Sequence, residues 1–196
     1  MDRFEQFERF DGLGLGGDGG GLTARLERWA AEARVDEAAR GRSRERWLRR
    51  QAEEESSVAG VLCDLLEAGT AVTVHTRAGR RHTGPVRAVG ADFVALDDPA
   101  GAVLVALATV ASLQTRPGAA LVVGDRAPAG GLQLADVAAG LAAAGERVLV
   151  VTADGAVLAG ELRSVGRDVA VLRGEGERPA AWYVPLAAIA ELVVGA

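Results

Sequence analysis

Hydrophobic and polar positions alternate in two stretches of the chain that occur in the same context. Residues 72–76 read VTVHT and residues 148–152 read VLVVT, and each stretch follows an apolar segment that ends in glycine. Side chains at every second position of a strand face the same side, so this alternation predicts strands with one buried face. The pattern predicts a β-rich unit that is present twice.

The two copies keep a constant offset of 76 residues over nearly forty positions. The segment VAGVLCDLLEAG at 58–69 matches LADVAAGLAAAG at 134–145, and each predicts a short amphipathic helix that ends at glycine. After a three-residue insertion, VAL at 105–107 matches VPL at 184–186. The chain is therefore a tandem duplication.

Two pairs of glycines have equivalent places in the copies. Gly79 and Gly155 fall where a hairpin turn is expected. Gly84 and Gly160 fall inside the next predicted strand, where the missing side chain lets a strand bend sharply. We expect a strongly bent strand at both positions.

Residues 1–21 predict a flexible N-terminal tail, because a glycine run, DGLGLGGDGGG, follows the opening segment. Phe4, Phe7 and Phe10 have the spacing of one helical face. This apolar stripe suits docking on a partner as well as packing on the protein itself. The glycines do not predict a nucleotide-binding loop, since no strand precedes them.

Residues 22–57 predict a helical region, with Asp36 as the cap of a second helix and Trp47 and Leu48 packed against the first. Six arginines lie between positions 40 and 50. The three that share a helical face and could contact phosphates are Arg42, Arg46 and Arg50. The acidic residues at 53–55 favour the alternative of a solvated face with i,i+4 ion pairs.

The copies define two domains, residues 58–113 and residues 132–196, separated by a Pro/Gly-rich connector at 114–131. Within the connector, AALVVG suits an edge strand or a cover over the seam between the copies. The connector, the following helix and ERVLVVTADG also resemble a nucleotide-binding βαβ unit. The duplication argues against this, because VTADG is already the first strand and turn of the second copy.

The amino-acid composition and the charge of the chain limit the fold and the function that we expect. The chain has 196 residues, of which 49% are hydrophobic but only 4% aromatic, which suits small barrels and short helices. All positive charges are arginines, the net charge is −5 and the pI is about 5.2. This balance argues against a protein that coats nucleic acid non-specifically.

The sequence offers no constellation for catalysis, a metal or a cofactor. Cys63 is the only cysteine, so neither a disulfide within the chain nor a cysteine-based zinc site is expected. His75 and His82 have no third ligand nearby. The adjacent Asp97 and Asp98 do not have the geometry of paired catalytic carboxylates. We expect a protein that is not an enzyme.

The opening segment MDRFEQFERF has acidic residues where a secretion signal has an apolar run. The longest apolar stretch, AVLVALATVASL, is too short to span a bilayer. We expect a soluble cytoplasmic protein without membrane association.

The repeated unit has the order helix, strand, glycine turn, bent strand, vG-x-D-x-v-x-L, strand and, in the second copy, V-P-L-x-x-I. This order resembles the Sm-like family of small β-barrels, and double-barrel proteins of high-GC bacteria are similar. The resemblance implies a mainly β fold of two tandem Sm/SH3-like barrels, each preceded by a short helix, after the α-helical N-terminal region. It covers residues 58–113 and 134–194.

RNA-binding members of that family use an Asp and an Asn with a stacking side chain between them. The resemblance assigns Asp92 and Phe93 to part of this set, but Val94 and Ala95 occupy the positions near the missing Asn. The basic-glycine pair of the last hairpin is missing too. The resemblance therefore implies a degenerate RNA pocket.

The first hairpin is basic, whereas its counterpart VTADGAVLAGELR is nearly neutral. Its candidate contacts to phosphate or to an acidic protein surface are Arg77, Arg80, Arg81 and Arg87. A solvated turn is the alternative.

Together these features favour a non-catalytic binding or assembly protein that engages protein partners through its barrels and N-terminal helices. The rival hypothesis is an RNA- or DNA-binding regulator of Sm-like type. Since two copies in one chain can cover each other's strand edges, we expect a monomer or homodimer rather than a large ring.

Overall fold

The computed structural model describes residues 19–99, 101–176 and 179–195. The chain divides into two compact units, residues 1–50 and residues 51–196. The predicted tail with Phe4, Phe7 and Phe10 lies outside the described residues.

The N-terminal helical region is a single helix, α1, which spans Gly19–Glu54. The prediction that a second helix begins at Asp36 is wrong, because the helical backbone continues through this residue. The surrounding alanine, glutamate and arginine residues are strong helix formers, and no proline interrupts them. The side chains of Trp47 and Leu48 are 62% and 50% exposed. The prediction that they pack against an earlier helix is therefore wrong.

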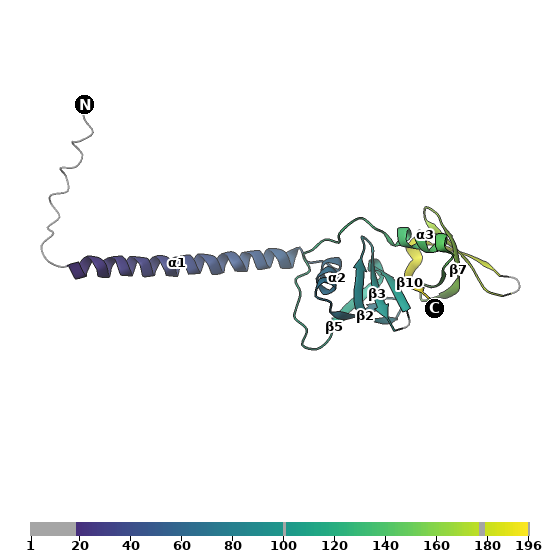
Figure 1. The fold of residues 1–196 in the computed structure, drawn as a ribbon, viewed down its shortest axis with the longest axis horizontal. Coiled ribbons are helices and arrows are strands. Elements are labelled where there is room, and N and C mark those ends of the chain that lie inside the picture. Colours follow the sequence, from purple (N-terminus) through teal and green to yellow (C-terminus); the bar gives the residue numbers. More distant parts are fainter. Residues whose placement is uncertain (1–18, 100, 177–178, 196) are drawn as a thin grey trace, which may run out of the picture. The chain divides into compact units, whose positions relative to one another are not determined.

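The second unit is mainly β (Figure 1). Its helices are α2 (Val58–Glu67) and α3 (Leu134–Ala144), with 3-10 turns η1 (Leu107–Thr109) and η2 (Leu186–Ala188). The strands are β1 (Ala71–Thr76), β2 (Arg81–Val89), β3 (Phe93–Asp98), β4 (Gly101–Ala106), β5 (Val110–Thr115), β6 (Arg147–Thr152), β7 (Val157–Val165), β8 (Val169–Arg173), β9 (Ala181–Pro185) and β10 (Ile189–Val194).

All the strands form one antiparallel sheet in the order β5-β1-β2-β3-β4-β10-β6-β7-β8-β9. We call β5-β1-β2-β3-β4 the first half-sheet and β10-β6-β7-β8-β9 the second half-sheet. The two are joined by the pairing of β4 with β10. The sheet is open, and among the described residues no strand pairs with the outer edges of β5 and β9.

The register confirms the predicted duplication. Val72 lies opposite Gly84 in the first half-sheet, and Val148 lies opposite Gly160 in the second. The irregularities of pairing repeat as well, since the register shifts once in β2 and once at the equivalent place in β7. The pairing of the strands is therefore equivalent in the two half-sheets.

The glycines have the predicted roles. Gly79 and Gly155 have φ values of +77° and +88°, which L side chains rarely adopt. A Cβ on Gly84 would lie 1.9 Å from the backbone oxygen of Asp97. On Gly160 it would lie 2.3 Å from the equivalent backbone oxygen. At both glycines the backbone therefore lies so close to the paired neighbouring strand that a Cβ would clash, as predicted.

The connector does not add an edge strand. Residues 116–133 form neither helix nor strand. Around Gly124 and Arg126 they contact α2 and the residue before it instead. The backbone of Gly124 accepts a hydrogen bond from the N–H of Ser57 at 2.9 Å and donates one to the carboxylate of Asp64 at 2.9 Å. Arg126 forms an ion pair with Asp64 at 3.2 Å. The start of α2 is thereby fixed to the connector.

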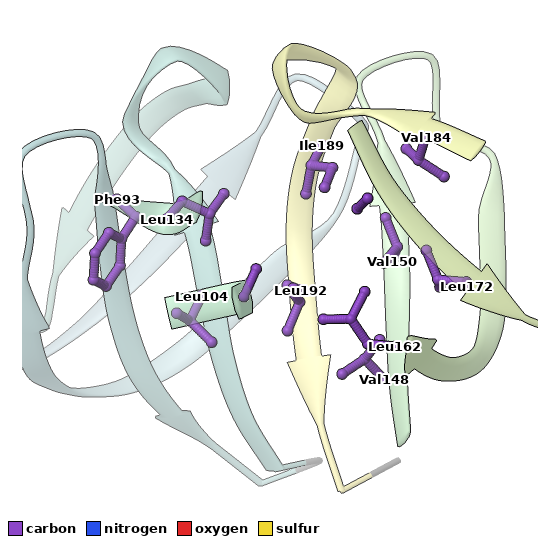
Figure 2. Close-up of a cluster of buried hydrophobic side chains, with 12 residues drawn as sticks. Phe93, Leu104, Leu134, Val148, Val150, Leu162, Leu172, Val184, Ile189 and Leu192 are labelled. Carbon is purple, nitrogen blue, oxygen red and sulfur yellow. The ribbon is translucent and has the colours of Figure 1, made fainter. Parts of the chain in front are cut away.

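Two hydrophobic clusters form the core, and β4 and β10 belong to both. Val103 and Val105 of β4 and Val193 of β10 lie in the cluster beneath α2. Leu104 of β4 and Leu192 of β10 lie in the other cluster, together with residues of α3 (Figure 2). Alternate side chains of the two central strands therefore face different clusters. The two hydrophobic clusters therefore have the paired strands β4 and β10 in common.

Candidate binding surfaces and the buried junction

A fully buried carboxylate lies where the half-sheets join. Glu191 of β10 extends into the first half-sheet, where the hydroxyl of Thr76 donates a hydrogen bond to its Oε1 at 2.7 Å. Its Oε2 lies 2.9 Å from Nε2 of His82 and 2.9 Å from Nε of Arg80. All three partners come from the β1–β2 hairpin. The glutamate therefore links the second half-sheet to the first.

The charges of this cluster set the protonation of Glu191. Burial by itself raises the pKa of the Glu191 carboxyl, but hydrogen bonds from His82 and Thr76 and the positive charge of Arg80 together hold it below its ordinary value. The other ring nitrogen of His82, Nδ1, lies 3.5 Å from the carboxylate of Asp98. The imidazole is thus placed between two carboxylates.

Some of the arginines in the basic first hairpin form ion pairs within the sheet. Arg80 faces Glu191, and Arg87 forms an ion pair with Asp97 across the neighbouring strand. Arg77 and Arg81 are exposed. Of the four arginines predicted as contacts for phosphate or a protein, two therefore have partners within the sheet.

Asp92 and Phe93, which the resemblance assigned to a degenerate RNA pocket, have structural roles in this protein. The carboxylate of Asp92 accepts a hydrogen bond from the N–H of Leu134 at 2.7 Å and so caps α3. Phe93 is only 2% exposed and packs in the core beside Leu134 (Figure 2). The expectation that Phe93 stacks on a base is wrong, because the helix of the second copy covers this strand.

Arg42, Arg46 and Arg50 are exposed on α1. Nε of Arg46 donates to the carbonyl of Arg42 at 3.2 Å, and its terminal nitrogen donates to the hydroxyl of Ser43 at 3.3 Å. These three arginines belong to α1 and not to the compact unit that carries the basic hairpin. Whether they contact phosphate stays a prediction.

A pocket of about 560 Å³ opens between η1, η2 and the start of α3. Its lining is mostly small and apolar, with polar groups from Asp92, Gln133, Arg167 and Asp168. Two N–H groups at the start of α3 already have acceptors, since that of Leu134 donates to Asp92 and that of Asp136 donates to the side chain of Gln133. With its mostly apolar lining, the pocket suits a small apolar group.

The outer strand β9 carries two exposed aromatic side chains. Trp182 is 45% exposed and Tyr183 is 72% exposed, and the strand between Ala181 and Val184 has no charged residue. Trp and Tyr are enriched where proteins bind each other. We call Ala181–Pro185 the aromatic edge. In the part of the chain that the structure describes, no strand pairs with its outer side.

Cys63 lies partly buried on α2. Burial raises the pKa of its thiol, Asp64 raises it further and Arg126 opposes the change. Because the thiolate is the reactive form, we expect Cys63 to react with iodoacetamide at pH 7.5 more slowly than free cysteine. Mass spectrometry of timed samples measures this, with urea-unfolded protein as the control. Equal rates in folded and unfolded protein would contradict the expectation.

Sequence reasoning missed Glu191 and the aromatic edge. A single glutamate within the apolar run IAELVVG was a signal for the first, because a charge in a buried strand requires a partner. Its partners precede it by 109 to 115 residues, so the pattern did not reveal them. The aromatic edge became visible only with the strand order.

No protein-family model, curated protein or solved structure matches this chain. Within residues 19–99, 101–176 and 179–195, no helix is both long and apolar enough to cross a membrane. In the same ranges, no three His, Cys, Asp or Glu side chains are grouped as metal ligands.

Proposed function

We propose that this protein is a non-catalytic binding or assembly protein that engages protein partners, built on two tandem Sm/SH3-like small barrels. The barrel assignment is supported by features that both half-sheets share. Each has five strands, a preceding short helix, a glycine packed tightly on the paired strand and a 3-10 turn before its last strand. We also propose that the protein is cytoplasmic.

The aromatic edge carries the proposal. Outer strands are normally protected from other chains by charges, proline or a covering segment. Pro185 protects only the end of β9, while Trp182 and Tyr183 offer apolar area next to its outer side. Such an edge suits a partner that adds a strand and covers the rings.

Nucleic acid is the second candidate, and it depends on Arg77 and Arg81. Both are exposed at the first hairpin and could contact phosphates. The net charge of −5 opposes such binding. Phe93 is buried, and the Nε of Arg80 is paired with Glu191. Protein partners therefore fit the described surface better.

The test of the main proposal is site-specific photo-crosslinking in cells. A photoreactive phenylalanine analogue at Tyr183 is expected to give discrete protein adducts that persist after nuclease treatment. The same analogue at Leu121, which is 99% exposed on the connector, is the matched control. Adducts at Leu121 alone, or nuclease-sensitive adducts only, would refute a protein-binding edge.

For the second candidate, we expect RNA to bind weakly. A fluorescence anisotropy titration with a generic RNA oligonucleotide should give a Kd no tighter than about 10 µM at physiological salt, as for non-specific binding. Nanomolar binding that Arg77→Glu with Arg81→Glu abolishes would replace the protein-binding proposal. Arg80 is left unchanged in this test because it is paired with Glu191.

A further inference from the structure

Helix α1 carries a row of exposed side chains with the spacing of a helix–helix contact. Two of them are tryptophans, of which Trp29 is 60% exposed and Trp47 is 62% exposed. The members of the row are separated by three, four or seven positions, and they are Leu26, Trp29, Ala33, Arg40, Ser43, Trp47 and Arg50. A repeat of seven residues places such side chains along the face of a helix that pairs with a second helix. We call these residues the α1 row.

The C-terminal half of the α1 row is hollowed. A cavity of about 250 Å³ is lined by Ser43, Arg46, Trp47 and Arg50. In paired helices, four residues with this spacing form the hole into which a side chain of the other helix inserts. The guanidinium of Arg46 is held beside the cavity by its hydrogen bond to the hydroxyl of Ser43 at 3.3 Å. The cavity therefore has the arrangement that receives a side chain from another helix.

We propose that α1 pairs antiparallel with α1 of a second copy of this chain, around a two-fold axis at Ala38. Residues equally far before and after Ala38 then lie opposite each other. Trp29 lies opposite Trp47 of the other copy and enters its cavity, and Ala33 lies opposite Ser43. The same face serves both copies, so the contact closes as a dimer. This contact is separate from the aromatic edge and goes beyond the function proposed for it.

The charges beside the α1 row fit this register. Glu32 comes beside Arg46 of the other copy, and Arg25 comes beside Glu53, on the side of the helix that borders the row. Because of the two-fold axis each of these opposite-charge contacts occurs twice. Against them, Glu37 approaches its own counterpart near the axis. Charge complementarity therefore favours a second α1 as the occupant of the row.

A parallel pair of helices would bring more equal charges together. With both copies in the same direction and register, Arg40 would face Arg40 and Arg50 would face Arg50. Glu32 would also approach Glu37 of the other copy. The antiparallel register separates the arginines, since Arg40 then lies opposite position 36, which is an aspartate in the sequence. The sequence of α1 therefore sets the direction of the pairing.

A second copy also supplies the packing that a long helix needs. Helix α1 has 36 residues, and its described side chains are exposed as far as Arg50. Most of the stability of helices in proteins comes from packing of one face. In the dimer Trp29 and Trp47 cover each other, and the aliphatic part of Arg50 covers Leu26 of the other copy.

The test uses two single-cysteine proteins in a Cys63→Ala background, Ala33→Cys and Ser43→Cys, which carry tags of different size. Helix axes about 8–10 Å apart bring facing Cα atoms to roughly 4–6 Å, which a disulfide can bridge. After incubation that lets the copies exchange, mild oxidation is expected to give a linked product that contains both tags. Each protein alone should give at least about tenfold less linked product, because neither cysteine faces itself. The control is Glu45→Cys with Ala33→Cys, since Glu45 lies on the other side of the helix.

Light scattering over a concentration series gives a second readout. The unmodified protein is expected to reach twice the 20.2 kDa of one chain. Trp29→Ala should raise the concentration at which the mass doubles at least about tenfold, because tryptophans commonly dominate the binding energy of a contact. Val35→Ala should not change it, since Val35 is 64% exposed and lies outside the α1 row. Circular dichroism melts check that both variants remain folded.

A charge exchange separates contact between copies from an effect on the helix itself. Glu32→Arg should raise the same concentration at least about threefold, because two arginines then meet at each of the equivalent places. Adding Arg46→Glu to the same chain should restore the original value, because opposite charges face each other again. A change in helix propensity alone is not reversed by the second substitution.

Three results overturn the proposal. One is a mixture that gives no linked product with both tags, or no more linked product than each variant alone. Another is a mass of one chain at every concentration, which is also the result if the α1 row binds a helix of a different protein. The third is a failure of Arg46→Glu to restore the effect of Glu32→Arg. None of them bears on the protein-binding proposal, because the adducts expected at Tyr183 come from the other compact unit.

Discussion

Replacing Glu191 by glutamine is expected to lower the free energy of unfolding at pH 7 by about 3 kcal/mol, as for other buried pairs that lose one partner. The amide keeps the volume but not the charge that faces Arg80 and His82. Urea denaturation measures the loss. The matched control is Glu146→Gln, which changes an exposed carboxylate of the same unit and should have little effect.

The same variant tests the direction of the pKa shift. The pKa of Glu191 is lowered in the folded protein, so its stabilisation is complete above the unfolded value of about 4.3 and is lost as the pH falls through the lower folded value. The difference between the unmodified protein and Glu191→Gln should therefore shrink below about pH 4.3. A difference that grows on acidification would show that the shift has the opposite sign.

A methyl group at Gly84 or Gly160 is expected to lower the free energy of unfolding by about 3 kcal/mol or more, at the upper end of the cost of overpacking. The added Cβ would lie 1.9 Å or 2.3 Å from a backbone oxygen of the adjoining strand, which has to move away. Thermal and urea denaturation of Gly84→Ala and Gly160→Ala measure the loss.

Gly140 in α3 provides the matched control. A Cβ at this position meets no atom within 4 Å, and alanine is a better helix former than glycine. We expect Gly140→Ala to raise the free energy of unfolding by about 0.5–1 kcal/mol. An unchanged melting temperature of Gly160→Ala, next to a normal response of the control, would mean that the strands do not lie so close there.

The duplication was predictable because the sequence itself contains both copies of the repeat at a constant offset. The constant offset identified equivalent glycines, and a glycine inside a strand indicates a place where another backbone comes close, as it does at Gly84 and Gly160. The order of the half-sheets was not predictable in the same way. It depends on β4 pairing with β10 and not with β5, which only the structure shows.

Long-range contacts also explain the two wrong predictions about side chains. Phe93 looked available because its own repeat leaves that face open, but α3 of the second repeat covers it. Trp47 and Leu48 looked like packing residues because a break at Asp36 would have made two helices. Local helix propensity carried α1 through Asp36 without a break.

The position of β10 has a consequence for how the protein is made. This strand is synthesised after the other strands of the sheet, yet it lies between β4 and β6 and supplies side chains to both hydrophobic clusters. A nascent chain that has not reached Ile189 therefore holds a first half-sheet with the edge of β4 open and a second half-sheet that lacks β10. Domains generally fold as units during translation, so joining these halves is a late step. The growing chain needs protection from edge-to-edge aggregation until that strand is added.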